Sequence, residues 1–444
     1  MADSIETLTA LANADDPFNT PHAELEELWV DAINQRFQQC RPRIKILDQL
    51  AERAGIDTIG SLEDVVPLLF AHTAYKSYPE SFIDNGRWDR MNLWLDTLSV
   101  NPVEGVDVDG IRNADDWIER CHAAGHHVFA TSGTSGKNSF LNQSAHDVEF
   151  ANAATIPPGL PTDNSLPIFV LGPRRAPNRA SATFTNLVSV CGREDAVYFL
   201  TDAELTITDL SQMTRMRRRI GDGTATPSEI AEFEANVKLR QEFADAMTVD
   251  LVDKVLSYRN EPMLLVGLTP QLYRIVETAR ERGVPDGTFH PDTQVISGGG
   301  AKGVNLPADH VQQIMTFLGI DLKNFTQGYG MQEASSGARM NEWGRYEFPG
   351  WIVPLLLDDS GERLQRASSG TSTGRMALFD VSIDGRWGGI ISGDRVTIDY
   401  DASPTGRAVP AVTEIARYSE LEGGDDKLTC AGTIDSFVRG AVGE

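Results

Sequence analysis

The stretch VFATSGTSGKNSF, residues 128–140, decides how this chain is interpreted. A short apolar strand leads into a loop that contains two glycines, a lysine and several hydroxyl side chains. Glycines permit backbone angles that other residues resist, while hydroxyl groups and Lys137 supply donors and positive charge for an anion. The stretch therefore predicts a phosphate-binding loop, and a Ser/Gly-rich surface turn is the alternative.

The loop is not a Walker A motif. That motif reads G-x-x-x-x-G-K-[ST], so that backbone amides surround the phosphates and a hydroxyl binds Mg²⁺. Counting back from Gly136 puts Thr131 at the first position, and Asn138 follows Lys137. Because both ends of the motif differ, the P-loop NTPase class is excluded.

Composition limits the classes of partner. The 444 residues are 41% hydrophobic and 23% charged, which is ordinary for a globular protein. The net charge of −25 argues against a broad surface for nucleic acid or an anionic membrane. No apolar run approaches the roughly 18 residues of a transmembrane helix, and the start, MADSIETLTA, lacks the features of a signal peptide. We expect neither a nucleic-acid nor a membrane partner.

The cysteines indicate the redox compartment. All of them occur singly, without a C-x-x-C pair, at Cys40, Cys121, Cys191 and Cys430. This spacing favours reduced thiols over a disulfide framework or a zinc site. We therefore expect a cytoplasmic protein.

Periodicity divides the chain into regions of different character. In residues 1–90, HAELEELWVDAINQRFQQC and PRIKILDQLAERAG have apolar residues at three-and-four spacing, which predicts a helical region. From 91 to 345, short apolar runs alternate with helical patterns, which predicts an α/β body. Residues 346–435 alternate strand-like runs with Gly/Asp/Ser turns and predict a β-rich subdomain, followed by a tail at 436–444. The fold class expected is α/β.

A second glycine motif offers a different interpretation. GGGAKG, residues 298–303, satisfies G-x-G-x-x-G after a predicted strand, and Asp321 lies about twenty residues on, as in a dinucleotide-binding unit. However, the helix is expected to begin at Pro307, a good first-turn proline. In a dinucleotide fold the helix should open within the glycines, so that its N-terminus meets the pyrophosphate. An NAD(P)-dependent oxidoreductase is therefore the weaker alternative.

Five motifs in order match one family. They are TSGTSGK (131–137), SGGGAKG (297–303), GYGMQE (328–333), SGD (392–394) and GTID (432–435). Their order and spacing resemble the adenylate-forming superfamily, which includes acyl-CoA synthetases, peptide-synthetase adenylation domains and luciferases. Within it the chain looks most like the phenylacetate-CoA-ligase-like and bacterial acyl-protein-synthetase branches. The resemblance implies the large N-terminal-type domain of these enzymes: two α/β subdomains plus a smaller β-rich one.

The resemblance implies a role for each matching position. The loop around the β- and γ-phosphates of ATP would consist of Thr131, Ser132, Gly133, Thr134, Ser135, Gly136 and Lys137. The adenine would be lined by Gly299, Gly300 and Ala301, with Tyr329 stacked on its face. Glu333 would bind Mg²⁺, a hard cation that suits carboxylate and phosphate oxygens, and Asp394 would bind the ribose hydroxyls. Taken singly, Tyr329 would be interpreted as a tyrosine at the end of a strand, Glu333 as a solvated carboxylate and Asp394 as an acidic residue of a turn.

The chain departs from the family pattern at several positions. Gln332 stands where the family has threonine before the metal-binding glutamate, and an amide can still donate to the α-phosphate. Thr433 stands where the hinge motif has arginine. Nine residues follow Asp435, whereas family members continue with a small domain that supplies a catalytic lysine. The resemblance therefore implies that this C-terminal domain is absent or vestigial here, and Lys137 is not the equivalent of its lysine.

Cys430, in KLTCAGTID, is a candidate acyl acceptor. The acyl-protein synthetases pass the acyl group to a cysteine near their C-terminus, which suggests a thioester at Cys430. A thiolate is the nucleophile in such a step; an incidental or buried cysteine is the alternative.

The sequence therefore predicts an ATP- and Mg²⁺-dependent enzyme that activates a small carboxylic acid as its acyl-AMP. The acyl acceptor would be coenzyme A, a thiol of a protein or carrier, or an amine. An adenylating enzyme for a non-carboxylate such as nitrite, a weakened nucleotide-binding partner protein and a homo-oligomer all remain open. Mg²⁺ and backbone amides would neutralise the charge that builds up as a carboxylate attacks the α-phosphate.

Overall fold

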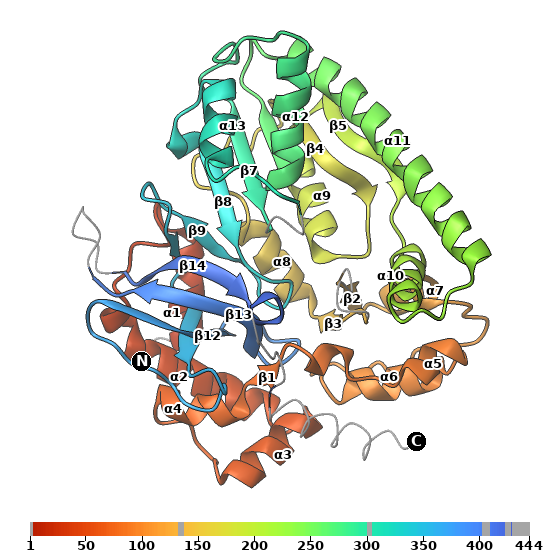
Figure 1. Cartoon of the computed structure of the whole chain (residues 1–444). Coiled ribbons are helices and arrows are strands. Elements are labelled where there is room, and N and C mark those ends of the chain that lie inside the picture. Colours follow the sequence, from red (N-terminus) through yellow and green to blue (C-terminus); the bar gives the residue numbers. More distant parts are fainter. Residues whose placement is uncertain (1–2, 132–136, 300–303, 402–408, 422–427, 429–444) are drawn as a thin grey trace. The chain divides into compact units, whose positions relative to one another are not determined.

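The computed structural model describes residues 3–131, 137–299, 304–401, 409–421 and 428. The chain folds into two compact units (Figure 1). The first comprises Met1–Thr131, Ser139–Ala154 and Met331–Glu444, and the second comprises Ser132–Asn138 and Thr155–Gly330. Both units combine helices with a β-sheet, so the α/β class expected from the sequence is confirmed.

The first unit begins with helices. These are α1 (Ser4–Ala10), α2 (His22–Cys40), α3 (Lys45–Ala54), α4 (Leu62–Val65), α5 (Glu80–Asp84), α6 (Trp88–Asp96) and α7 (Ala114–Ala123), with α8 (Ala145–Ala154) further along. The two segments with three-and-four spacing are α2 and α3, as predicted. Local signals set their ends: α3 stops at Gly55, which adopts φ 68°, and the Asn113 side chain caps α7 by accepting from the Asp116 amide.

The sheet of the first unit is built mainly from the C-terminal part of the chain. Its strands are β1 (Phe70–Ala71), β9 (Ala338–Met340), β10 (Tyr346–Glu347), β11 (Ile352–Leu357), β12 (Thr371–Asp380), β13 (Gly389–Asp399) and β14 (Ala411–Arg417). The order β11-β12-β13-β14-β10-β9 is antiparallel between β11 and β14, and β1 pairs in parallel with the start of β13. A separate hairpin consists of β2 (His127–Ala130) and β3 (Phe140–Gln143).

Aromatic side chains fill the core of the first unit beside β12 and β13. Trp387 is fully buried and lies edge-on to Phe379 and Phe37, with ring centroids 4.7 and 6.2 Å away. Its indole N–H donates to the Leu68 carbonyl at 2.8 Å, so its polar end is also satisfied. This packing fixes the connection between β12 and β13, residues 381–388, in the interior.

The second unit is a parallel sheet with helices. Its strands are β4 (Leu166–Arg175), β5 (Gly192–Glu204), β6 (Leu264–Leu268), β7 (Gln294–Gly298) and β8 (Phe325–Tyr329), in the order β8-β7-β6-β4-β5. Every pair in this series is parallel. The connections contain α9 (Arg179–Cys191), α10 (Ile207–Gly221), α11 (Pro227–Ser257), α12 (Thr269–Glu281) and α13 (His310–Leu318). Continuous apolar runs such as residues 264–268 are typical of strands that are covered on both faces.

No helix among the described residues is long and apolar enough to cross a membrane. The longest, α11, starts with Pro227 after a capping box between Thr226 and Glu229. Much of its first half is solvent-exposed and charged, which is the pattern of a surface helix.

Candidate functional site

The predicted phosphate loop joins the two strands of the β2–β3 hairpin. Ala130 lies opposite Phe140, the last paired residues before the loop. The Thr131 amide donates to the Ser139 carbonyl at 3.0 Å, and the Ser139 amide donates to Thr131 Oγ1 at 3.0 Å. These two bonds close the base of the loop, and they engage the hydroxyl of Thr131 there. The predicted positions 132–136 lie outside the described residues.

An aromatic cluster fixes the base of this hairpin. Phe140 is fully buried, and its ring lies 5.2 Å from Trp117, 5.5 Å from Tyr78 and 6.4 Å from Trp94. Aromatic pairs of this kind contribute about 0.5–1.5 kcal/mol each beyond their buried area. The strand that leaves the loop is therefore held against α6 and α7. Lys137, at the other side of the loop, is half-buried and belongs to the second unit.

Glu333, the predicted Mg²⁺ ligand, lies in the loop before β9 and is only 8% exposed. Among the described residues, its carboxylate has no hydrogen bond and no salt bridge. Burying a carboxylate without a hydrogen bond is costly, the nearby Arg386 guanidinium attracts it electrostatically, and a hard divalent cation prefers such an oxygen donor. The residue therefore fits the magnesium role that its motif implies. Gln332 precedes it and is half-buried.

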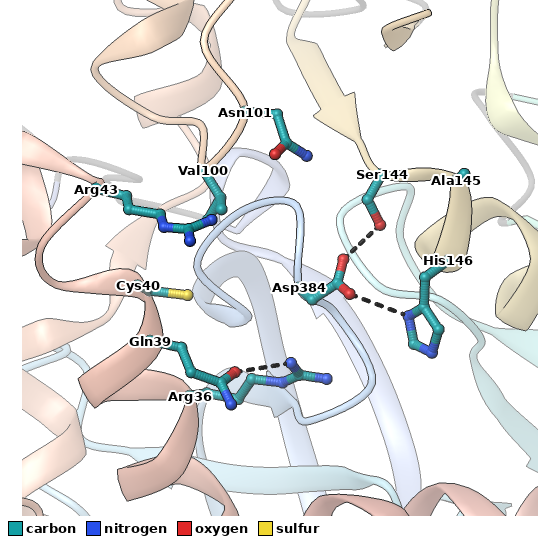
Figure 2. A pocket seen from close by; sticks show the side chains of 10 residues that line it. All are labelled: Arg36, Gln39, Cys40, Arg43, Val100, Asn101, Ser144, Ala145, His146 and Asp384. Atoms are coloured by element: carbon teal, nitrogen blue, oxygen red, sulfur yellow. Dashed lines mark hydrogen bonds and ion pairs between the residues drawn. The ribbon is translucent and has the colours of Figure 1, made fainter.

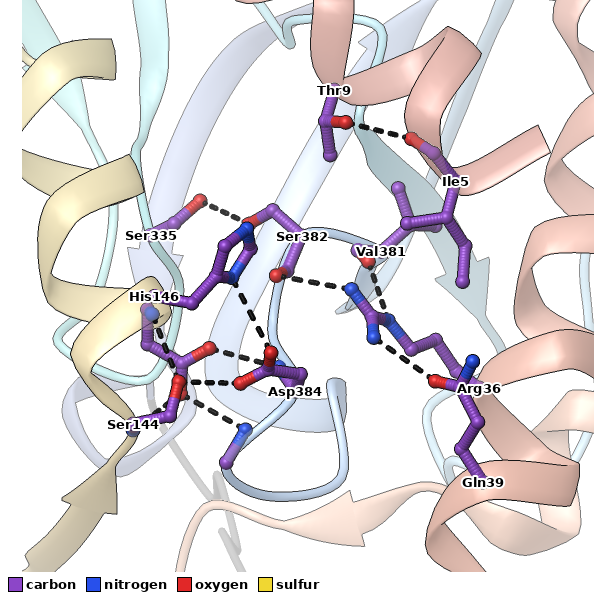
Figure 3. Close-up of polar contacts among 12 residues, drawn as sticks. Ile5, Thr9, Arg36, Gln39, Ser144, His146, Ser335, Val381, Ser382 and Asp384 are labelled. Atoms are coloured by element: carbon purple, nitrogen blue, oxygen red, sulfur yellow. Dashed lines mark hydrogen bonds and ion pairs between the residues drawn. The ribbon is translucent and has the colours of Figure 1, made fainter. Parts of the chain in front are cut away.

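The loop that carries Glu333 is tied to the end of β12, and Figure 3 shows Ser335 of this loop joined to Ser382, which follows that strand. The Asp380 carboxylate is fully buried and accepts from the Ser335 amide at 2.6 Å. It also accepts from the Ser382 amide at 3.0 Å and the Ser382 hydroxyl at 2.6 Å. The Ser382 hydroxyl lies 3.0 Å from the Ser335 hydroxyl. Hydrogen bonds to a charged acceptor are strong, about 1.5–3 kcal/mol each, so this loop has one defined backbone path.

A buried arginine makes a second tie to the same loop. Arg386 is 1% exposed, and its Nη2 donates to the Glu333 carbonyl oxygen at 2.5 Å. Its Nη1 lies 3.4 Å from the Tyr75 hydroxyl and 3.5 Å from the Trp387 carbonyl. Its Nε is buried and has no hydrogen-bond partner among the described residues. The guanidinium therefore anchors Glu333 through the main chain, and it attracts the Glu333 carboxylate electrostatically without a hydrogen bond to it among the described residues.

Helix α8, which follows β3, begins with a reciprocal cap. The Asp147 amide donates to Ser144 Oγ at 3.0 Å, and the Ser144 amide donates to Asp147 Oδ2 at 3.1 Å. This is the capping-box arrangement. The Asp147 carboxylate also accepts from the amides of Asp384 and Gly385, at 2.8 and 3.1 Å. Burial raises the pKa of Asp147, and the main-chain donors oppose that shift. The start of α8 is thus joined to residues 381–388.

Gly385 is required at this junction. A Cβ at this position would lie 2.5 Å from the Ser144 nitrogen and 2.7 Å from Asp147 Oδ2. Real Cβ contacts are never this short, and the first clash is with main chain. Only a glycine allows the two segments to approach so closely.

A cavity of about 590 Å³ opens beside this junction, within the first unit (Figure 2). Arg36 and Arg43 lie on one side of it, and Ser144, His146 and Asp384 lie on the other. Arg36 is held by the carbonyls of residues 381 and 382, at 2.9 and 3.3 Å. Cys40 also lines the cavity, but burial raises the pKa of its thiol to about 12. Because a thiolate is needed for nucleophilic chemistry, this buried thiol is poorly suited to act as a nucleophile.

Three potential metal ligands meet at the edge of this cavity. Donor atoms of His146, Asp147 and Asp384 all lie within 4.8 Å of one another. Hydrogen bonds account for them: Asp147 accepts main-chain amides, and Asp384 accepts from the Ser144 hydroxyl and lies 3.5 Å from His146 Nδ1. The three side chains therefore lie together because Asp147 caps α8 and Asp384 contacts both Ser144 and His146.

Asp394, the predicted ribose-binding acid, lies on β13 in the first unit. Its side chain is 13% exposed and lies 3.7 Å from Arg417 Nε on the neighbouring strand. Its amide donates to Ser392 Oγ at 3.1 Å, and that hydroxyl donates to the Met376 carbonyl at 2.8 Å. The SGD motif therefore lies where the pairing of β13 with β14 ends. Hydrogen bonds through Ser392 fix its main chain, and the motif presents the carboxylate of Asp394.

The predicted adenine-binding residues lie at one edge of the second unit. Gly298 pairs with Gly328 in the parallel β7–β8 ladder. Gly299 and Tyr329 follow these two residues, so the structure brings both to the carboxyl ends of adjacent strands, where ligands bind in open α/β sheets. Gly299 adopts φ 72°, a conformation that favours glycine. Gly300 and Ala301 lie outside the described residues.

The helix after these glycines starts later than expected. It was predicted to begin at Pro307, but α13 begins at His310. The Pro307 carbonyl accepts from the His310 amide at 3.1 Å and lies 2.7 Å from His310 Nδ1, so a separate turn precedes the helix. The helix N-terminus therefore does not open within the glycines, which is what a dinucleotide fingerprint needs. This geometry disfavours the NAD(P) interpretation.

Some functional candidates fall outside the described residues, and others were not found from the sequence. Cys430, Thr433 and Asp435 belong to the first group. Asp380 and Arg386 belong to the second, because their partners lie about fifty residues away in the chain. The sequence SAHD at 144–147 does carry a capping signal, although nothing in it indicates a link to Gly385.

No family model matches this chain. No curated protein matches it.

Solved structures do show similarity to the chain. One is a long-chain-fatty-acid-CoA ligase from Archaeoglobus fulgidus, at 13% identity and TM-score 0.40, over 67% of this chain and 52% of that chain. Another is an o-succinylbenzoate CoA synthetase from Bacillus subtilis, at 12% identity and TM-score 0.34, over 67% and 52%. A third is a luciferase from Phrixothrix hirtus, at 12% identity and TM-score 0.36, over 64% and 43%. The chain thus spans about half the length of these chains, and a likeness this distant decides no chemistry.

Proposed function

We propose that this protein is an adenylate-forming enzyme. It would use Mg-ATP to activate a small carboxylic acid as its acyl-AMP, with release of pyrophosphate. The acyl group would then pass to a thiol, of coenzyme A or of a protein, or to an amine. The observation that carries the proposal is Glu333: a nearly buried carboxylate that forms no hydrogen bond or salt bridge among the described residues and lies in the field of Arg386, on a loop tied at both Glu333 and Ser335.

Each part of the proposed site has a chemical task. The glycine- and hydroxyl-rich loop with Lys137 would bind the β- and γ-phosphates, and the amide of Gln332 would donate to the α-phosphate. Glu333 would bind Mg²⁺, which would lower the charge on the phosphate oxygens as pyrophosphate leaves. Asp394 would accept hydrogen bonds from the ribose hydroxyls. Tyr329 and Gly299, with Gly300 and Ala301, would line the adenine.

The acyl acceptor and the setting are parts of the same proposal. Cys430 would carry a thioester if a protein thiol is the acceptor, and coenzyme A is the other thiol of suitable chemistry. A carrier protein would serve in the same way. The singly spaced cysteines support a reducing, cytoplasmic setting.

Acid-dependent exchange between ATP and labelled pyrophosphate tests the proposal. A panel of aromatic and aliphatic carboxylates, with nitrite included, would be assayed with Mg²⁺. We expect exchange that requires one class of acid and that is lost in Lys137→Ala and Glu333→Gln. Glu342→Gln, an exposed glutamate close by in the chain, is the matched control and should exchange normally. Exchange with nitrite alone would replace the carboxylate by a non-carboxylate substrate. No exchange with any compound would overturn the reaction.

A further inference from the structure

We propose that residues 381–388 form a bracket that holds two parts of the site in one register: the loop of Glu333 and the base of the β2–β3 hairpin. Gly385 and Arg386 are its positioning residues. The inference rests on the proposed function, because it assigns those two parts to the metal and the phosphates. All of the bracket's contacts lie within the first unit.

The bracket reaches the metal-binding loop at two points. Arg386 donates to the Glu333 carbonyl at 2.5 Å. Ser382 and Asp380, at the start of the bracket, contact Ser335 through the bonds described above. Since the contacts lie at Glu333 and two residues beyond it, they fix the main-chain position from which the Glu333 side chain extends.

The same bracket reaches the hairpin through α8. The amides of Asp384 and Gly385 donate to Asp147. Figure 3 shows the Ser144 hydroxyl joined to the Asp384 carboxylate, which accepts its hydrogen bond. Ser144 directly follows β3, the strand that leaves the predicted phosphate loop. Fully buried Phe140 and the closed loop base make that strand rigid. A shift of the bracket would therefore move the base of the loop.

The bracket itself has little freedom. Arg36 holds the carbonyls of Val381 and Ser382, and the Val100 amide donates to the Gly385 carbonyl at 2.9 Å. Trp387 is fully buried with its N–H satisfied. Helix α2, the segment after α6 and the aromatic core thus contact the bracket. The close approach of Gly385 to Ser144 and Asp147 leaves no room for the bracket to shift towards α8.

The chemistry explains why such rigidity is needed. Mg²⁺ requires near-ideal octahedral geometry, with oxygen ligands at about 2.0–2.1 Å. A carboxylate on one loop and phosphates on another must therefore keep their separation closely. Gly385 contacts Asp147 at the start of α8, and Arg386 contacts the main chain of Glu333. Because the two residues are consecutive, one planar peptide group links these two contacts.

Calorimetric affinity for ATP, measured with Mg²⁺ and with a chelator, tests the inference apart from activity. The ratio of the affinity with Mg²⁺ to the affinity with the chelator measures how much Mg²⁺ strengthens the binding of ATP to the protein. Arg386→Lys keeps the charge but loses the planar fork that reaches both Glu333 and Tyr75, and Gly385→Ala disturbs the hairpin side. We expect each to lower the ratio about tenfold or more, the usual effect of losing a group that orients a metal ligand.

Arg375→Lys is the matched control. Arg375 is also 1% exposed in the first unit and donates to main-chain carbonyls of residues 359 and 392. It should lower the melting temperature and leave the ratio unchanged. If a bracket variant fails to fold, the milder Ser144→Ala replaces it, with a smaller drop in the ratio expected.

The outcomes separate the two proposals. A wild-type protein that binds ATP more tightly with Mg²⁺, together with bracket variants that keep the full ratio, overturns the bracket and leaves the proposed function standing. A wild-type protein whose ATP binding does not depend on Mg²⁺ overturns the metal role of Glu333 and the bracket with it.

Discussion

The carboxylate of Asp380 accepts a 2.6 Å hydrogen bond from the main-chain amide of Ser335, two residues after Glu333. Asp380 is the last residue of β12, whereas Ser335 lies in the loop before β9. The two residues are 45 positions apart in the chain. Together with the bond from Arg386 to the Glu333 carbonyl, the bond between Asp380 and Ser335 holds this loop in place. Because Asp380 is fully buried, this contact also belongs to the energetics of the fold.

Replacing Asp380 should therefore cost stability. Asp380→Ala leaves the buried amides of Ser335 and Ser382 without acceptors, and each unsatisfied buried group costs about 1–3 kcal/mol. We expect a loss of roughly 2–5 kcal/mol in the free energy of unfolding, measured by urea denaturation. Asp380→Asn keeps one carbonyl acceptor and should lose less. Equal losses in the two variants would contradict the assignment of the acceptor role.

The approach of Gly385 to α8 should not tolerate a side chain. In Gly385→Ala the new methyl group would meet Ser144 nitrogen and Asp147 Oδ2 well inside contact distance, so the main chain must shift. Overpacking of this kind costs about 1–3 kcal/mol. Gly105→Ala, where a Cβ would meet nothing within 4 Å, is the control, and its unfolding free energy should stay near the wild-type value. A destabilised control with an unaffected Gly385→Ala would refute the packing.

His22 should make the protein sensitive to acid. Its ring packs edge-on to Trp29, with centroids 4.9 Å apart, and burial lowers its pKa from 6.5 to about 4. The folded state thus prefers the neutral ring, so its stability contribution is complete above pH 6.5 and is lost as the pH falls towards 4. The loss reaches about 3 kcal/mol at most.

His22→Phe should abolish this acid loss while keeping the aromatic contact. Urea denaturation at pH 7 and pH 4.5 measures it, and the variant should lose less stability between these values than the wild type. His310→Phe, in the second unit, should retain the wild-type difference. If His22→Phe and the wild type lose the same amount, the imidazole is not the source.

Asp394 should affect nucleotide recognition and leave acid recognition unchanged. Hydrogen bonds to a charged group are worth about 1.5–3 kcal/mol, so Asp394→Asn should raise the KM for ATP roughly tenfold or more. The KM for the acid should stay constant, as measured by pyrophosphate exchange at varied ATP and acid. The control is Glu414→Gln on β14, which contacts Thr397 only at the surface. A parallel rise in both KM values would show a general disturbance of the fold.

Sequence patterns predicted many helices and strands, because each of these depends mainly on residues that are close together in the chain. The apolar spacing of α2 and α3 predicted both helices, and alternation with turns predicted the strands after residue 345. The start of α13 was wrong by three residues, because a proline that suits a first turn can equally close the turn before a helix. Such a choice depends on hydrogen bonds that periodicity does not encode.

The sequence by itself determined the α/β class, the order of the motifs and the residue types that phosphate and magnesium chemistry would need at Lys137, Glu333 and Asp394. Tertiary structure alone decided that Glu333 is nearly buried beside the Arg386 guanidinium, and that Asp380, Gly385 and Arg386 fix its surroundings. The physical reason is distance along the chain. Spacing and composition record interactions within a helix turn or a strand pair, whereas a buried carboxylate and a buried guanidinium find their partners only after segments far apart in sequence have packed together.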